Sequence, residues 1–109
     1  MAEPTLVQIF GASATQDSTT LTITKSSLTG LTASGSNSAE SLLVAILLKA
    51  QAYLTQTNFD ANTDQSIYIS SGFSSFTTRG TNNDPYRVDQ LTINLAKPDT
   101  GSTLDPDDY

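Results

Sequence analysis

The chain has 109 residues and a formal net charge of −6, from eleven acidic and five basic side chains, with no cysteine and no histidine. This length is typical of one domain. The missing residue types exclude disulfides, thiol chemistry and the usual zinc and iron sites. Binding of nucleic acid or of an anionic membrane needs clustered basic residues. We expect neither partner, because the five basic residues are scattered: Lys25, Lys49, Arg79, Arg87 and Lys97.

Neither the start of the chain nor its most apolar stretch resembles a targeting segment. The start, MAEP, has no basic region of the kind that opens a secretory signal. Residues 42–48 are strongly apolar, but a bilayer span needs about 20 residues. We therefore expect synthesis in the cytoplasm, with no signal peptide and no transmembrane segment. The chain contains fourteen serines and seventeen threonines. These predict a hydroxyl-rich surface that can contact another protein without desolvating many ions.

In chain order, the first elements are short and apolar. Residues 5–10 (TLVQIF) form an apolar run before Gly11, which we interpret as a strand or as an arm laid on a surface. Residues 19–24 (TTLTIT) alternate, with Leu21 and Ile23 on one face, as in a half-buried strand. We divide the single domain, residues 1–109, into an N-terminal arm or loop (1–18), a core (19–97) and an acidic tail (98–109).

One long helix and a cluster of strands follow. Asn37 and Glu40 make a capping-box-like start for a helix over residues 38–56. After a loop at 57–64, strands are expected at 65–69, 73–78 and 86–96, with a turn at 79–85. Strands joined by short turns pair antiparallel. The predicted fold class is α+β, with one long helix packed on a mainly antiparallel sheet of about four to five strands and an N-terminal arm or strand.

The long helix is apolar on two sides, which a helix lying on the sheet of a free monomer should not be. Its wider face is expected to pack on the sheet: Ala39, Leu43, Ile46, Leu47, Ala50, Tyr53 and Leu54. A second strip holds Val44, Leu48 and Ala52, together with Ala45. Either the N-terminal run covers this strip within the chain, or the strip is a subunit interface. An arm reaching a neighbouring copy would combine the two. The predicted interface residues are Leu6, Val7, Ile9, Phe10, Val44, Leu48 and Ala52.

Candidate catalytic and metal-binding motifs all have simpler interpretations. Asp60, Asn62 and Asp64 are spaced like the first three ligands of a calcium-binding loop. Gln65 and Ser71, however, stand where that loop needs Gly and Glu. The motif is better interpreted as a turn rich in Asp and Asn. We expect no catalytic, metal or cofactor site.

Three further sets of residues have the composition of a functional site. The acids Asp105, Asp107 and Asp108 lie in a tail that offers no walled cleft for acid–base catalysis. Lys25-Ser26-Ser27 supplies the residue types of a Ser–Lys pair, without a convergent acid, base and nucleophile. An aromatic platform for sugars or bases could be imagined from Tyr53, Tyr68, Phe73, Phe76 and Tyr86, although we expect most of them in the core.

The segments VQIFG, TTLTITKSSLTGLT, SAESLLVAILLKAQ, QSIYIS and YRVDQLTINL together resemble small virion proteins of tailed phages, particularly those that infect cyanobacteria. The resemblance implies a non-enzymatic capsid cement, or decoration, protein in the virion. Such a protein stabilises the shell by associating with itself and with the major capsid protein. A different minor head or tail component, or a surface module that binds a receptor or glycan, remains the alternative.

Overall fold

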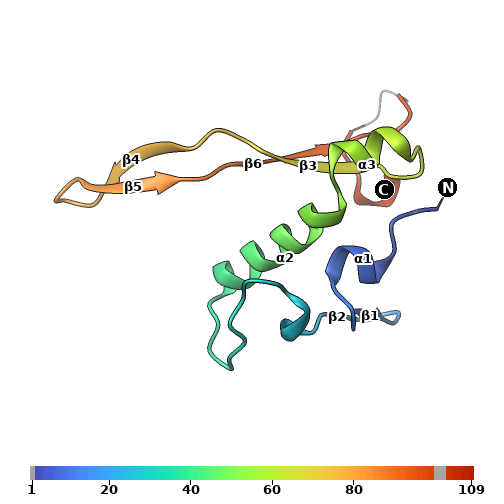
Figure 1. Ribbon diagram of the computed structural model, residues 1–109, viewed down its shortest axis with the longest axis horizontal. Coiled ribbons are helices and arrows are strands. Elements are labelled where there is room, and N and C mark those ends of the chain that lie inside the picture. The colour runs from blue at the N-terminus through green and yellow to red at the C-terminus, as the bar shows by residue number, and fades with distance from the viewer. Residues whose placement is uncertain (1, 100–102) are drawn as a thin grey trace.

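The computed structural model describes residues 2–99 and 103–109, and it combines α-helices with antiparallel strand pairs (Figure 1). Its helices are α1 (Leu6–Phe10), α2 (Ala39–Tyr53) and α3 (Gln56–Ala61), with 3₁₀ turns at Lys25–Ser27 and Pro106–Asp108. Its strands are β1 (Thr15–Gln16), β2 (Leu21–Thr22), β3 (Ile67–Ser71), β4 (Ser75–Arg79), β5 (Asp84–Val88) and β6 (Leu91–Leu95). Helices mixed with antiparallel strands were expected. The prediction of one sheet with four to five strands is wrong, because the described strands pair only as β1–β2, β3–β6 and β4–β5.

The N-terminal run forms a helix, so its interpretation as a strand is wrong, and the run lies on α2 as this short helix. The Thr5 hydroxyl accepts a hydrogen bond from the Gln8 amide (3.2 Å), and the Gln8 side chain accepts one from the Thr5 amide (2.8 Å). This reciprocal pair is a capping box, which satisfies two amides that a helix start leaves free. Gly11 ends α1 with φ 115° and ψ 167°, a conformation open essentially only to glycine. The strand expected at 19–24 is confined to the two residues of β2.

The long helix was predicted correctly in position, but its ends differ. Ser38, not Asn37, caps α2 by accepting a hydrogen bond from the Ser41 amide (3.1 Å). Asn37 is used in the preceding loop, where its side chain donates to the Thr32 carbonyl (3.0 Å). At the other end α2 stops at Tyr53. The Thr55 hydroxyl then caps α3 by accepting from the Asn58 amide (3.1 Å), so the expected loop at 57–64 is largely helical.

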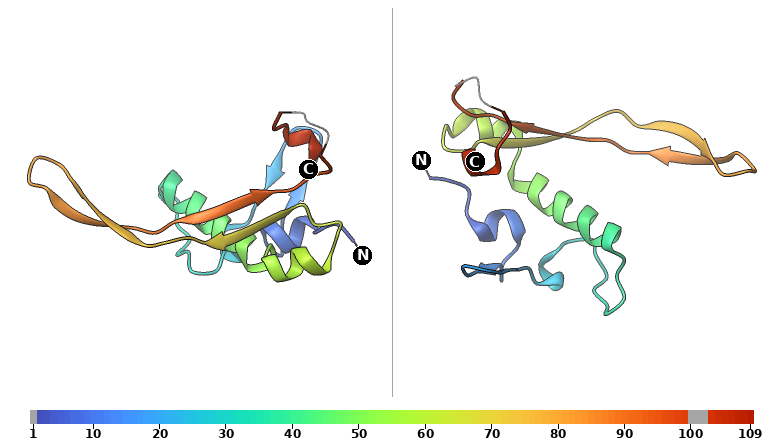
Figure 2. Two further views of the ribbon diagram at one scale, coloured as in Figure 1. Left: turned by 90° about the horizontal axis from the view of Figure 1, so that it is seen from above. Right: turned by 180° about the vertical axis from the view of Figure 1, so that it is seen from behind.

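The strands after α3 form one long two-stranded ribbon that extends away from the helices (Figure 2). At its base, β3 and β6 pair from Ile67 opposite Leu95 to Ser71 opposite Leu91. The Gly72 amide donates to the Gln90 carbonyl (2.7 Å) and links this pair to β4–β5. The single strand expected at 86–96 is therefore interrupted at residues 89–90.

The hydrophobic core is small and lies where the base of the ribbon meets the C-terminal end of α2. Its buried residues are Ala50, Leu54 and Ile69, and partly buried residues pack around them: Ile9, Tyr53, Ile67 and Leu91. The Ile69 amide also donates to the Leu54 carbonyl (2.8 Å). Beyond this junction α2 and the ribbon diverge (Figure 1). Leu43, near the start of α2, is 56% exposed, so the prediction that the whole wide face packs on a sheet is wrong for its N-terminal half.

The C-terminal tail folds back at the end of the molecule that holds the base of the ribbon. Lys97 Nζ forms an ion pair with Asp108 Oδ2 (2.7 Å) and donates to the Thr103 carbonyl (3.0 Å). Tyr109 is half-buried. Both termini lie near α3, opposite the free end of the ribbon (Figures 1 and 2). Of the predicted N-terminal and tail segments, Met1 and residues 100–102 lie outside the described residues.

Candidate assembly surface

The face of α2 that carries Val44, Leu48 and Ala52, here named the outer strip, stays open to solvent. Val44 is 53% exposed and Leu48 47% exposed, and Ala52 is also exposed. A hollow of about 330 Å³ lies beside the strip, lined by Thr29, Gly30, Leu31, Glu40, Ser41, Val44, Ala45 and Leu48. A second hollow of about 310 Å³ follows at Thr29, Leu48, Lys49 and Ala52. Exposed apolar side chains beside a hollow make this face a candidate for contact with another molecule.

The N-terminal helix packs on α2 but does not cover the outer strip. Ile9 joins the core beside Ala50 and Leu54. Leu6 and Phe10 are half-buried, whereas Val7 is exposed. No residue of α1 lines either hollow beside the strip. The chain thus uses its N-terminal run to cover a different side of α2, and the assignment of all seven residues to an interface remains a prediction.

Exposed apolar side chains also lie on residues 73–90, here named the arm, which contain β4, β5 and the turn between them. Every residue of the arm is exposed, including Phe73 at 89% and Phe76 at 77%. Tyr86 and Val88 are exposed as well. The arm pairs only with itself, from Ser75 opposite Val88 to Arg79 opposite Asp84. An isolated two-stranded hairpin is at best marginally stable in water, so a partner would stabilise this one.

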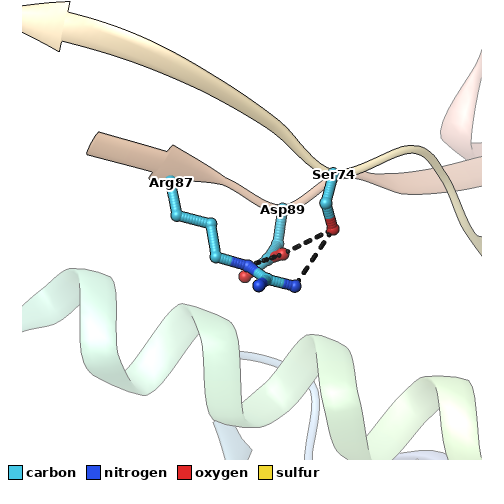
Figure 3. Close-up of polar contacts among 3 residues, drawn as sticks. All are labelled: Ser74, Arg87 and Asp89. Atoms are coloured by element: carbon cyan, nitrogen blue, oxygen red, sulfur yellow. Dashed lines mark hydrogen bonds and ion pairs between the residues drawn. The ribbon is translucent and has the colours of Figure 1, made fainter. Parts of the chain in front are cut away.

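Polar side chains hold the two sides of the arm together at its base (Figure 3). Arg87 Nε pairs with Asp89 Oδ1 (2.9 Å), which also accepts a hydrogen bond from the Ser74 hydroxyl (2.9 Å). Arg87 Nη2 donates to that same hydroxyl (3.2 Å). Two hydrogen bonds lower the pKa of the Asp89 carboxyl: the larger effect comes from Arg87 and the smaller from Ser74. The cluster fixes Arg87 on one face of the arm, although its exposure limits what it adds to stability.

The candidate chemical groups are engaged in local structure. The Asn62 side chain accepts from the Asp64 amide (3.0 Å) and donates to the Ala2 carbonyl (2.8 Å), as expected of a turn. Lys25 Nζ donates to the Ser34 carbonyl (2.7 Å). Among the residues that the structure describes, no three His, Cys, Asp or Glu side chains are close enough to share a metal ion. In the same part of the chain, no helix has the length and apolar character to cross a membrane.

The aromatic residues do not form one platform. Tyr68 stacks at an angle on Phe59, with 4.8 Å between ring centroids, and Tyr53 packs beside the core. Phe73, Phe76 and Tyr86 lie apart from them, on the arm. The Arg79 guanidinium lies 5.0 Å from the centroid of the Tyr86 ring and covers one face of it. The expectation that most aromatics lie in the core therefore fails for the arm.

Comparison of the chain with protein-family models, with curated proteins and with solved structures found no match. We therefore infer the function from the outer strip and the arm. The sequence had pointed to the strip through the two-sided helix. The prediction that most aromatic residues lie in the core missed the exposure of Phe73, Phe76 and Tyr86, although one signal was present: β4 (SFTTR) has a single apolar residue.

Proposed function

We propose that this chain is a non-enzymatic structural subunit that becomes fully packed only within an assembly of its own copies and a second protein. The amount of exposed surface carries the proposal. The chain has an accessible surface of 7970 Å², whereas a compact protein of the same mass exposes about 5,800 Å². Its radius of gyration is 16.6 Å, against about 13 Å for a compact chain of this length. The difference of about 2,200 Å² is similar to what one subunit buries in an extensive obligate interface.

The arrangement of that surface supports assembly rather than ligand binding. The outer strip and the arm both expose large apolar side chains, and both are about as long as a secondary-structure element. Catalysis would need a nucleophile, an acid or a base in a walled cleft. The hollow at Val44 is lined mainly by aliphatic and hydroxyl side chains, with one carboxylate at Glu40. Such a lining provides area for packing and no convergent chemistry.

The assembly we propose is the shell of a tailed-phage virion, in which the chain acts as a capsid cement protein bound to the major capsid protein. The sequence resemblance motivates this choice. An arm that extends beyond the body is suited to cross a junction between capsid subunits and bury apolar surface there. A hydroxyl-rich surface with few charges keeps the desolvation penalty of such a contact low.

The test is the copy number of the chain in purified virions of the phage that encodes it, measured by quantitative mass spectrometry against the major capsid protein. A cement protein is expected in a fixed, high ratio to that protein, and shells that lack it should open at a lower temperature. Absence from virions, or a few copies in each, would contradict the cement role. A few copies would instead favour a minor head or tail component.

A glycan- or receptor-binding module is the second candidate, favoured by the exposed rings of Phe73 and Phe76. Exposed aromatic rings can stack on sugars. A double variant, F73A/F76A, separates the two roles. It should leave virion adsorption unchanged if the arm is a packing element, and abolish adsorption if the arm binds a receptor.

A further inference from the structure

We propose that the arm of one copy lies along the outer strip of a second copy of this chain, with Phe76 beside the hollow at Val44 and Leu48. This inference rests on the self-association in the proposed function and specifies its geometry. In a two-fold dimer the contact would occur twice, because each copy contributes one arm and one strip.

The arm does not reach the outer strip of its own chain. It leaves the base of the ribbon and extends past the helices into solvent (Figures 1 and 2). The polar side chains at its base, Ser74, Arg87 and Asp89, bond to one another and not to α2. Whatever packs against the arm must therefore come from another molecule.

The two surfaces match in length and shape. A five-residue strand such as β4 extends about 17 Å, and the stretch of α2 from residue 41 to residue 52 rises about 17 Å. Phe76 is paired directly opposite Arg87, so both side chains lie on the same face of the arm. Figure 3 shows that Arg87 points to the side on which α2 lies. This face thus presents an exposed aromatic ring, and the strip presents aliphatic groups around a hollow of about 330 Å³.

The charges permit this contact. The whole chain has a formal net charge of −6, but the arm has a net charge of zero, because Arg79 and Arg87 balance Asp84 and Asp89. The arm can therefore approach an acidic body without net repulsion. Glu40 lines the hollow beside the strip, and Arg87 shares the face of Phe76. Asp89 lies on that same face, 2.9 Å from Arg87 Nε, so the arm would bring a neutral ion pair to Glu40 and no unpaired carboxylate.

A second copy is the occupant that explains both uncovered surfaces at once. Any other partner would need to supply one molecule for the arm and one for the strip, or a surface that fits both. The chain has about 2,200 Å² more exposed surface than a compact protein, and obligate homodimers bury about 2,000–5,000 Å² in total. A reciprocal contact between arm and strip would cover the outer strip and the Phe76 face of the arm, and it would leave Tyr86 and Val88, on the other face of the arm, for the second protein of the assembly.

The absence of cysteine makes the contact directly testable by cross-linking between engineered single cysteines. One batch of the full chain carries Ala52→Cys on the strip, and a second, differently tagged batch carries Thr78→Cys on the arm face of Phe76. After the batches exchange subunits, mild oxidation or a short bismaleimide should link position 52 of one tagged chain to position 78 of the other. The face control is Thr77→Cys, which lies on the opposite side of the arm, and the collision control is Ser36→Cys in an exposed loop.

The proposal expects strong cross-linking from position 78 and little from positions 77 and 36. It also expects Phe76→Asp to raise the dissociation constant of self-association at least about thirtyfold, as loss of a central aromatic contact does. The charge-matched control, Thr57→Asp on α3, should leave that constant unchanged. An oligomer without links from position 78, or with equal links from 77, overturns this contact but not the proposed function. A chain that stays monomeric overturns both.

Discussion

The substitution Leu48→Glu separates a surface that awaits a partner from one that the chain seals itself. Leu48 is 47% exposed, so folding of one chain removes only about half of its side chain from water. Complete burial of a leucine contributes roughly 1.5–3 kcal/mol, and the part gained within the chain is therefore about 1 kcal/mol. We expect Leu48→Glu to lower the free energy of unfolding of the isolated chain by about that amount and to leave it folded.

The effect on association should be much larger, because the partner would have to cover a carboxylate. Burial of an uncompensated charge at an interface costs several kcal/mol. We therefore expect at least a hundredfold weaker self-association, measured by sedimentation equilibrium alongside urea unfolding at a concentration where the chain is dissociated.

Leu54→Glu is the matched control, since Leu54 is buried in the core of the single chain. This control should unfold the protein outright. If Leu48→Glu behaves in the same way, the outer strip is sealed within the chain. If it leaves association unchanged, the strip is not the interface. Either result would refute the reasoning.

Three further predictions concern local structure. Gly11→Ala should lower the free energy of unfolding in urea by about 1–3 kcal/mol, because φ at this position is 115° and the added Cβ would lie 2.7 Å from Ser27 Cβ. The control Gly35→Ala has open space around the added Cβ and should leave the free energy of unfolding unchanged. Equal effects of the two substitutions would contradict the turn assigned at Gly11. Hydrogen bonds from the Thr19 and Thr20 amides and hydroxyls lower the pKa of the Asp17 carboxyl from 3.8 to about 2. The ionised carboxylate should therefore stabilise the β1–β2 turn fully above pH 3.8, and this stabilisation should be lost as the pH falls toward 2. An NMR titration of Asp17 with a midpoint near 3.8 would be inconsistent with this prediction. Asp89→Asn should speed amide hydrogen exchange in β4 and β5 but not in α2, and unchanged exchange in the arm would show that the Ser74–Arg87–Asp89 cluster does not stabilise it.

The elements that local signals specify were predictable from the sequence. The apolar stretch at 42–48 and a polar cap before it located α2 to within a few residues, and alternation located β3 and β6. The outer strip was also visible, because an apolar residue on the back of a helix needs a cover wherever the sheet lies.

Two local signals in the sequence favour helices where a strand and a loop were predicted. Thr5 and Gln8 have the spacing of a capping box, and Leu6, Ile9 and Phe10 recur at helical intervals. A run of only six residues is ambiguous between strand and helix, and its contact with α2 decided the outcome. Thr55 likewise had the character of a cap for α3.

The arrangement of the strands could not be predicted in the same way. Alternation indicates that a segment is extended, but it does not tell which other strand it pairs with or whether a third strand lies beside it. The division of residues 86–96 into β5 and β6 depends on the link between Gly72 and Gln90, which is a contact across the ribbon. The arm is exposed because of the direction in which the ribbon leaves the core, and that direction is a tertiary property.

The most direct test of a chain that is fully packed only in an assembly is its mass in solution, measured by sedimentation equilibrium of the unaltered protein at micromolar concentrations. We predict a mass at least twice that of one chain, with a dissociation constant below the loading concentration. A single species with the mass of one chain at every concentration would contradict the account.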